Sequence, residues 1–413
     1  MSAFSIFIIY FLIVFYGRVA SISILSQLPL LFFLVILARD LLGKSKPMYY
    51  IFTAIFFLCV VLSALINRVS WVNVIIFLGI NSAAFAAWSV MRIQHTSSYN
   101  AIRRWITTTI ILGSTFAIVQ KSYVKSPDFV RGLFINLGNG AHVFTAITIL
   151  YIAAIYFYPR ILPDAFLKPW RRLYLTVYCL YSASLSDGKQ VFLVLVISLL
   201  FPLVKYLIRN RSSIKGRLRL IVTTSAIVFI IYWGYTYGYL KIGWLDQPNL
   251  IFLGLELKFY IFEIIGKVND TALGFFFGAG PGMVSSRLAL MLPDYARLLD
   301  PSFITISPLT DKILYFQESN YVTNTSTGSS LFSLTFSLAA FVGEVGVLGT
   351  SFYVLALFKI INSLRTIRTE YFSLFFCAYY IILGVVYQYW EEPIFVYFAF
   401  MIYAAIFLHE RRQ

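Results

Sequence analysis

The residues of this chain that could take part in chemistry gather in four short glycine-containing stretches, separated by long apolar runs. Each stretch combines glycine, which permits close backbone approach, with polar side chains that could bind an anion or accept a proton. Taken singly, each is more commonly a loop or a helix-packing site. The four are RGLFINLGNGAH (131–142), SLSDGKQ (184–190), FGAGPGMVSSR (277–287) and FVGEVGVLG (341–349).

Three residues in or near these stretches are candidates for a general base, a group that takes the proton from an attacking hydroxyl. They are Glu318, Asp187 and His142. The alternative for each carboxylate is a solvated surface residue. Glu344 lies inside an apolar run, where an acid is costly and is often functional. Its spacing from Gly346 equally suits a packing kink closed by a hydrogen bond.

Four basic residues could stabilise negative charge that develops on a leaving group, an effect that is strong where water is excluded. They are Lys189, Lys258, Arg287 and Arg131. The alternative is that such residues neutralise lipid phosphates or cap the carboxyl ends of helices.

These stretches interrupt a chain of 413 residues that is 60% hydrophobic and 12% charged, with a mean hydropathy of +0.82. Such values exclude an ordinary soluble domain and predict a polytopic membrane protein. Apolar runs of about 20 residues indicate an all-α fold, because a helix satisfies its own backbone groups in lipid. The three cysteines all lie in apolar runs, so no disulfide framework or metal-binding spacing is expected. No cofactor is expected either.

The apolar runs predict about twelve transmembrane helices, with eleven or thirteen left open because two runs are short. Residues 1–237 hold nine of them, residues 335–413 hold three, and residues 238–334 form one large polar segment between the two groups. The runs are 4–16, 21–38, 48–66, 71–91, 105–120, 141–158, 173–184, 190–208, 219–236, 335–358, 371–388 and 393–409.

The distribution of lysine and arginine sets the predicted orientation. Most of the 33 basic residues fall in loops on one side, and the positive-inside rule makes that side cytoplasmic. Both termini are then cytoplasmic, the first apolar run is a retained helix, and residues 238–334 lie outside. The same effect explains the net charge of +16, so no nucleic-acid partner is expected.

The long outer segment, residues 238–334, is expected to contain short helices. Residues 250–267 have a helical composition, and Glu256, Glu263 and Lys267 fall on one stripe. Lys258 lies about 200° around this helix from Glu256, among apolar residues. Such a helix is expected at the membrane interface, with its apolar face towards lipid or the helix bundle.

In this order and topology, the four stretches resemble the O-antigen polymerase (Wzy) and O-antigen ligase superfamily of bacterial envelope glycosyltransferases. The likeness covers about residues 125–350, with the polymerase branch favoured. The chain departs from the family where Lys189 and Lys258 occupy what look like arginine positions, which removes the planar fork that binds phosphate through two hydrogen bonds. The matching residues are Gly132, Phe134, Asn136 and Asn139; Ser186, Gly188 and Lys189; Gly278, Gly280 and Gly282; and Glu344, Gly346 and Gly349.

The resemblance implies a GT-C-like membrane enzyme that polymerises oligosaccharide repeat units carried on undecaprenyl pyrophosphate, by direct, metal-independent and inverting transfer. It would work at the periplasmic face of the bacterial inner membrane, among membrane lipids, with a chain-length regulator and a flippase as further partners. The pyrophosphate would bind Lys189, Lys258, Arg287 and Arg131. The glycan would contact Tyr315, Tyr321 and Asn139, although tyrosine also populates membrane interfaces.

Two other functions stay open. An O-antigen ligase would move the glycan to another acceptor, but that branch carries a histidine late in the large loop. Here His95 and His409 are predicted on the cytoplasmic side and His142 precedes the loop. A flippase or transporter of lipid-linked oligosaccharide would favour internal repeats and charged residues along a path at the membrane midplane, and the sequence has no such repeat.

Overall fold

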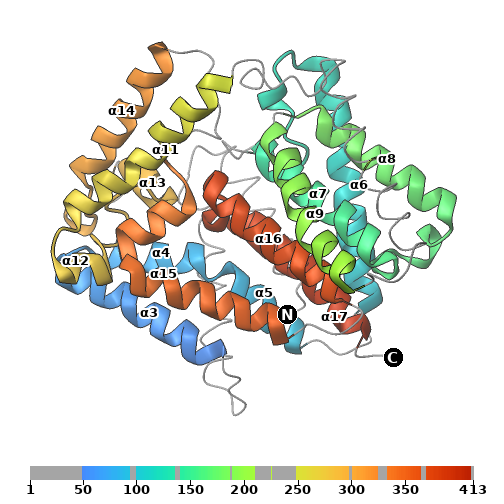
Figure 1. The fold of residues 1–413 in the computed structure, drawn as a ribbon, viewed down its shortest axis with the longest axis horizontal. Helices are drawn as coiled ribbons and strands as arrows, with labels where there is room; N and C mark the ends of the chain where they lie inside the picture. Colours follow the sequence, from blue (N-terminus) through green and yellow to red (C-terminus); the bar gives the residue numbers. More distant parts are fainter. Residues whose placement is uncertain are drawn as a thin grey trace. The chain divides into compact units, whose positions relative to one another are not determined.

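The computed structural model describes residues 49–93, 99–134, 140–186, 188–209, 225, 248–296, 300–323, 333–363 and 369–410, and the findings below concern these residues. Every regular element among them is a helix (Figure 1). The predicted all-α class is therefore confirmed for this part of the chain. The predicted runs at 4–16 and 21–38, and all but Ser225 of the run at 219–236, lie outside the described residues.

The chain divides into two compact units, and each is described by itself. The first unit consists of Met1–Ile93, Trp244–Ser363 and Leu383–Tyr397, and the second of Gln94–Gly243, Leu364–Ile382 and Phe398–Gln413. The first holds α3 (Tyr49–Ile66), α4 (Trp71–Asn81), α5 (Ala83–Ile93), α11 (Pro248–Val268), α12 (Ala272–Phe277), α13 (Arg287–Ala296), α14 (Pro308–Thr323) and α15 (Ser337–Ser363). The second holds α6 (Tyr99–Tyr123), α7 (Gly140–Phe157), α8 (Pro169–Ser184) and α9 (Lys189–Arg209), and both units share α16 (Glu370–Val386) and α17 (Pro393–Glu410).

Two helices in the described part are long and apolar enough to cross a membrane, namely α7 and residues Ser337–Asn362 of α15. A third, broken span would be formed by α4 and α5 together, which are bent by 52°. The helices α3, α9, α16 and α17 are apolar over shorter lengths. The chain thus has helices of the membrane type, while the total of twelve spans stays a prediction.

The bend between α4 and α5 has a local cause. The side-chain amide of Asn81 donates to the carbonyl of Phe77 at 2.9 Å, and the hydroxyl of Ser82 donates to that of Gly79 at 2.8 Å. Such bonds compete with the helical backbone pattern and favour a break. The predicted run at 71–91 is therefore two helices rather than one.

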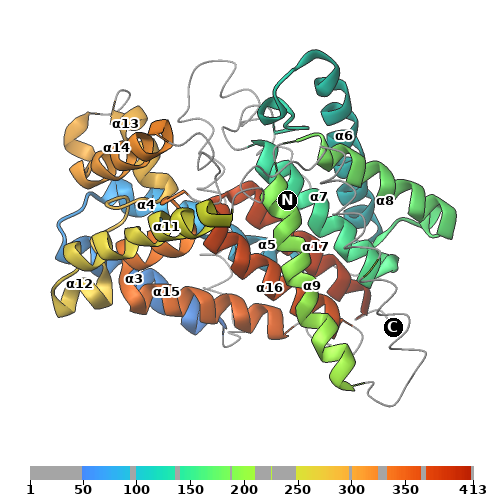
Figure 2. The same cartoon turned by 45° about the horizontal axis from the view of Figure 1, so that its top comes forward.

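The core of the first unit lies between α3 and α15, which run side by side (Figures 1 and 2). Phe56 of α3 and Tyr353 of α15 are fully buried, with ring centroids 5.1 Å apart. The ring centroids of Phe341 and Tyr353 are 4.5 Å apart, and the two rings are tilted relative to each other. Aromatic pairs at such distances add to the stabilisation from burial.

The described part of residues 238–334 has a helical core of its own, packed on the start of α15. The predicted helix at 250–267 is confirmed as α11, and Lys267 donates to Glu263 at 2.7 Å, as their spacing predicted. This core is formed by Ile261, Ile265, Val284, Ile313, Leu334, Phe336 and Ala339.

The centre of the second unit is α7, most of which is buried. α8 and α9 pack against it, and α6 packs against α8. The hydroxyls of Thr107 on α6 and Tyr151 on α7 are 2.7 Å apart and fully enclosed, so the two helices are also joined by a buried hydrogen bond.

Candidate functional site

The third and fourth polar stretches meet in the first unit through two glycines. Gly278 and Gly346 have φ values of 73° and 69°, with ψ of −172° and −177°. This backbone region is essentially restricted to glycine. A Cβ on Gly346 would lie 2.2 Å from the carbonyl oxygen of Phe276, and one on Gly278 would lie 2.5 Å from the carbonyl carbon of Glu344. The two backbones therefore approach more closely than any other residue type allows.

The carboxylate of Glu344 is fully buried and is bound by the backbone of the glycine loop, defined here as residues 278–286. Its Oε2 accepts the N–H of Gly282 at 2.6 Å. Its Oε1 accepts the N–H groups of Val284 at 3.2 Å and Ser286 at 3.0 Å. Glu344 therefore makes hydrogen bonds of the kind that the packing interpretation of its spacing predicts, and its functional role stays a prediction.

Two asparagines hold the other side of the glycine loop. Asn67, in the turn after α3, donates to the carbonyl of Gly278 at 2.9 Å. Asn73 donates to the carbonyls of Pro281 at 3.2 Å and Thr305 at 2.8 Å. Residues 278–305 are thus fastened to the turn after α3 and to α4, as well as to α15.

Arg287, the first residue of α13, contacts two adjacent carboxylates that follow α16. Its backbone N–H donates to Oε1 of Glu391 at 3.2 Å, and its guanidinium forms a short ion pair with Oε2 of Glu392. The Arg287 side chain is 18% exposed, whereas both glutamates are almost fully buried. Burial, together with the nearby carboxylate of Glu344, raises the pKa of Glu391 well above its ordinary value.

Lys258 is buried in the first unit, on α11. Its Nζ donates to the carbonyls of Ser333 at 3.3 Å and Val386 at 3.0 Å, and it lies 4.4 Å from the centre of the Phe336 ring. Val386 ends α16, where the helix dipole is negative and attracts a cation. Burial nevertheless lowers the pKa of Lys258 to about 7.

The first and second polar stretches meet in the second unit. Gln190 on α9 forms a hydrogen bond of 2.9 Å with Nδ1 of His142 on α7. The hydroxyls of Thr145 and Ser186 share a short hydrogen bond, and a Cβ on Gly188 would lie 2.3 Å from Oγ1 of Thr145. Glycine at 188 therefore allows the start of α9 to contact α7.

Of the remaining predicted site residues, five are described by the structure and two are not. Arg131 packs against Gly140 at the start of α7, with its guanidinium 5.1 Å from the centre of the Phe129 ring. Tyr315 on α14 is 75% exposed. Glu318 and Tyr321 also belong to α14, and Lys189 is the first residue of α9. Asp187 and Asn139 lie outside the described residues.

The structure brings two of the four predicted cations to the same segment. Lys258 binds the end of α16 at Val386, and Arg287 binds Glu391 and Glu392 just beyond it. Lys189 and Arg131 belong to the second unit. The predicted meeting of all the cations therefore stays a prediction.

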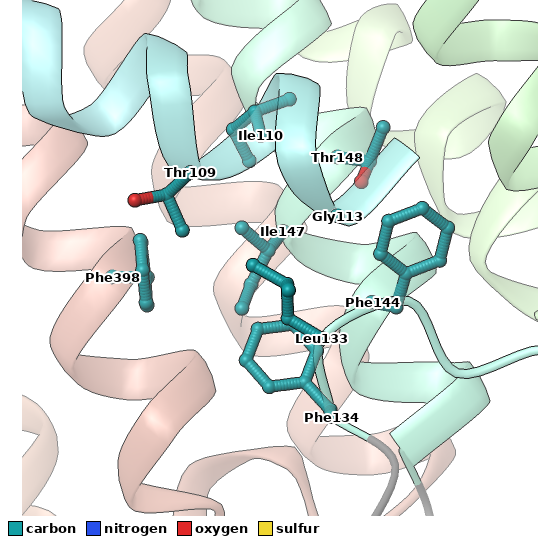
Figure 3. Close-up of a pocket in the computed structure, with 9 residues that line it drawn as sticks. All are labelled: Thr109, Ile110, Gly113, Leu133, Phe134, Phe144, Ile147, Thr148 and Phe398. Atoms are coloured by element: carbon teal, nitrogen blue, oxygen red, sulfur yellow. The ribbon is translucent and has the colours of Figure 1, made fainter. Parts of the chain in front are cut away.

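A small cavity in the second unit lies beside the first polar stretch (Figure 3). Its volume is about 10 Å³, roughly the space that one water molecule needs. The wall is almost entirely apolar, so this is a packing gap and is far too small for a sugar ring. It is lined by Thr109, Ile110, Gly113, Leu133, Phe134, Phe144, Ile147, Thr148 and Phe398.

The functional candidates that the sequence reasoning missed are Glu391 and Glu392. The signal was available, because they are adjacent acids in a chain with only 17, placed between two apolar runs and followed by Pro393. Nothing in the sequence ties them to Arg287, which is more than 100 positions away. Among the described residues, no group of three His, Cys, Asp or Glu side chains could hold a metal ion.

Comparison of the chain with known protein families, with characterised proteins and with solved structures finds no match.

Proposed function

We propose that this chain is a membrane glycosyltransferase that polymerises oligosaccharide repeat units carried on undecaprenyl pyrophosphate. It would move the growing glycan from its carrier onto the non-reducing end of the next lipid-linked unit, producing O-antigen, capsular polysaccharide or exopolysaccharide. In this proposal about twelve helices cross the bacterial inner membrane, both termini are cytoplasmic and the active face is periplasmic.

The observation that carries the proposal is the set of attachments of the long outer segment. It contacts the turn after α3 through Asn67 and the turn after α16 through Glu391. The charge distribution independently predicts both turns on the outer side. Agreement of these two contacts with one topology supports an outer helical cluster that carries Lys258 and Arg287 at the membrane boundary.

The proposed reaction needs cations because its leaving group is a pyrophosphate. The acceptor hydroxyl attacks the anomeric carbon of the donor, the bond from that carbon to the pyrophosphate oxygen breaks, and the configuration inverts. The hydroxyl proton passes to a base, and the lipid pyrophosphate leaves with added negative charge. Fixed cations near the lipid boundary stabilise that charge, the role assigned to Lys189, Arg287, Lys258 and Arg131.

Of the three predicted bases, His142 has a described partner that can orient its ring. The amide nitrogen of Gln190 donates to Nδ1 of His142 at 2.9 Å, so the proton of the neutral ring lies on Nε2. To act as a base, His142 would have to lose this bond, or the Gln190 amide would have to turn so that its oxygen accepts from Nδ1–H and Nε2 carries no proton. His142 stays one of three bases to test.

The test is an assay of the purified full-length chain in lipid nanodiscs or proteoliposomes with synthetic lipid-linked repeat units. A ladder of progressively longer glycans on the lipid is the expected product. Transfer of one glycan to a different acceptor, without a ladder, would instead indicate a ligase.

A lipid-linked oligosaccharide carrier is the second candidate, and one observation favours it. Transporters often bind substrate at interrupted helices, and this chain has a 52° bend between α4 and α5 and a break in α15 at Gly346. In proteoliposomes a carrier would move the labelled lipid-linked unit across the bilayer without lengthening its glycan. Movement without a ladder would overturn the polymerase proposal.

A further inference from the structure

Three buried carboxylates lie close to Arg287 in the first unit, and their charges are compensated to different extents. Glu344 accepts three backbone N–H groups, and Glu392 pairs with the Arg287 guanidinium. Glu391 accepts the backbone N–H of Arg287 at Oε1. Its second oxygen, Oε2, is buried with no hydrogen-bond partner among the residues that the structure describes.

The charged groups that face Glu391 come from every element around it. Glu344 from α15 and Glu392 from its own turn disfavour a negative charge on Glu391, whereas Arg287 from α13 favours it. The guanidinium of Arg287 is already engaged by Glu392. An ionised carboxylate without full compensation is costly to bury, and a second like charge nearby adds to that cost.

We propose that Glu391 is held as a neutral carboxylic acid in the folded protein, and that this neutrality sets the affinity of Arg287 for an anionic diphosphate. The first part rests on burial, on the unpartnered oxygen and on the neighbouring carboxylates. The second part rests on the proposed function, in which Arg287 contacts the pyrophosphate. Glu391 acts through Arg287 and is therefore a positioning residue.

The physical consequence concerns the local charge. With Glu391 protonated, the charges of Arg287 and Glu392 cancel, and the carboxylate of Glu344 is held by three backbone N–H groups. The Arg287 side chain is 18% exposed, so an anion can reach it. Loss of the proton adds one buried negative charge beside Arg287, which repels a diphosphate in a region of low dielectric. The affinity for a diphosphate should therefore fall as the pH rises through the range in which Glu391 ionises. The raised pKa of Glu391 agrees with this direction.

The protonation state can be measured without reference to any activity. Infrared spectra of the full-length chain in nanodiscs are compared for wild type, Glu391→Gln and the control Glu256→Gln, whose carboxylate is exposed on α11. At neutral pH we expect the carbonyl band of a protonated carboxylic acid to lose intensity in Glu391→Gln and to remain in Glu256→Gln. An unchanged band in Glu391→Gln would overturn the inference.

The effect on Arg287 is tested by binding of inorganic pyrophosphate to the same three proteins across a range of pH. Because pyrophosphate itself titrates, the comparison is between wild type and variants at each pH. At high pH, Glu391→Gln should bind about tenfold more tightly than wild type or better. At low pH it should match wild type, and Glu256→Gln should follow wild type throughout.

The outcomes separate this inference from the proposed function. Equal affinities of wild type and Glu391→Gln at every pH would overturn the link between Glu391 and Arg287, whether or not a glycan ladder forms. A ladder that forms while wild type binds no pyrophosphate would overturn the role of Arg287 and leave the polymerase standing. Absence of a ladder with the expected pH-dependent binding would overturn the polymerase alone.

Discussion

The carboxylate of Glu344 accepts the backbone N–H of Gly282 at 2.6 Å, across 62 positions of sequence. This bond joins the fourth polar stretch to the third, inside a fully buried environment. The acid in the apolar run, Glu344, therefore accepts hydrogen bonds from the backbone of the glycine loop.

Replacing Glu344 with Gln should therefore destabilise the protein whether or not substrate is present. The amide nitrogen of Gln cannot accept a hydrogen bond, so at least one of the three loop N–H groups loses its acceptor. A buried donor left without a partner costs about 1–3 kcal/mol. The measurement is the thermal unfolding temperature in detergent. The exposed Glu256→Gln is the control, and a Glu344→Gln protein as stable as wild type would contradict the hydrogen-bonded kink.

Two glycine-to-alanine changes should have opposite effects. In Gly346→Ala the new methyl group would lie 2.2 Å from the Phe276 carbonyl oxygen, at a φ of +69°. The conformation alone costs about 1–3 kcal/mol, and the steric overlap adds to it. The matched control is Gly266→Ala in α11, where nothing lies within 4 Å of the new methyl group. It should stabilise the helix by up to about 1 kcal/mol. Yields of folded protein and unfolding temperatures measure both changes, and a harmless Gly346→Ala would show that the close approach is not required.

The sequence could predict what depends on local pattern. The apolar periodicity located α3, α7, α9, α11, α16 and α17 within a few residues, and spacing alone predicted the contact between Lys267 and Glu263. It could not predict the break after Asn81, because side chains that bond back to the helix act against the hydropathy pattern.

The site could be predicted only in part. The four polar stretches were recognised, but not their pairing, in which Gln190 meets His142 in one unit and Gly278 meets Gly346 in the other. Such pairings depend on tertiary packing. For the same reason the role of Glu391 was missed, since its partner Arg287 is distant in sequence and supplies a backbone N–H.

Lys258 should make stability depend on pH. Its pKa falls from an ordinary 10.5 to about 7 on folding, so below pH 10.5 the unfolded chain binds this proton more readily than the folded chain. Stability should therefore fall as the pH drops from about 10.5 to about 7, by about 1.4 kcal/mol per pH unit. Lys258→Met should lose this dependence. Lys267→Met, on the same helix but exposed, should keep it. If the unfolding temperatures of wild type and Lys258→Met vary with pH in the same way, the prediction is wrong.

Loss of Lys189 or Arg287 should abolish the glycan ladder when each alanine variant is assayed at equal amounts of folded protein. Lys189→Ala is the cleaner test, because a cation at the first residue of a helix is disfavoured by the dipole and its removal should not harm α9. Arg287→Ala also removes the partner of the buried Glu392, so a lower unfolding temperature should accompany its loss of activity. Full activity of both variants would refute the assignment of these residues to the pyrophosphate.

The glycine loop is joined to α15 by its own main-chain N–H groups, three of which donate to the Glu344 side chain. Ala279 and Gly280 donate to the carbonyls of Gly343 and Glu344 at 2.8 Å and 2.9 Å. A joint of this kind depends little on which side chains residues 279 and 280 carry. The sequence around it could therefore vary while the joint to α15 stays the same, and a chimaera that keeps residues 278–286 and 343–346 should keep these hydrogen bonds.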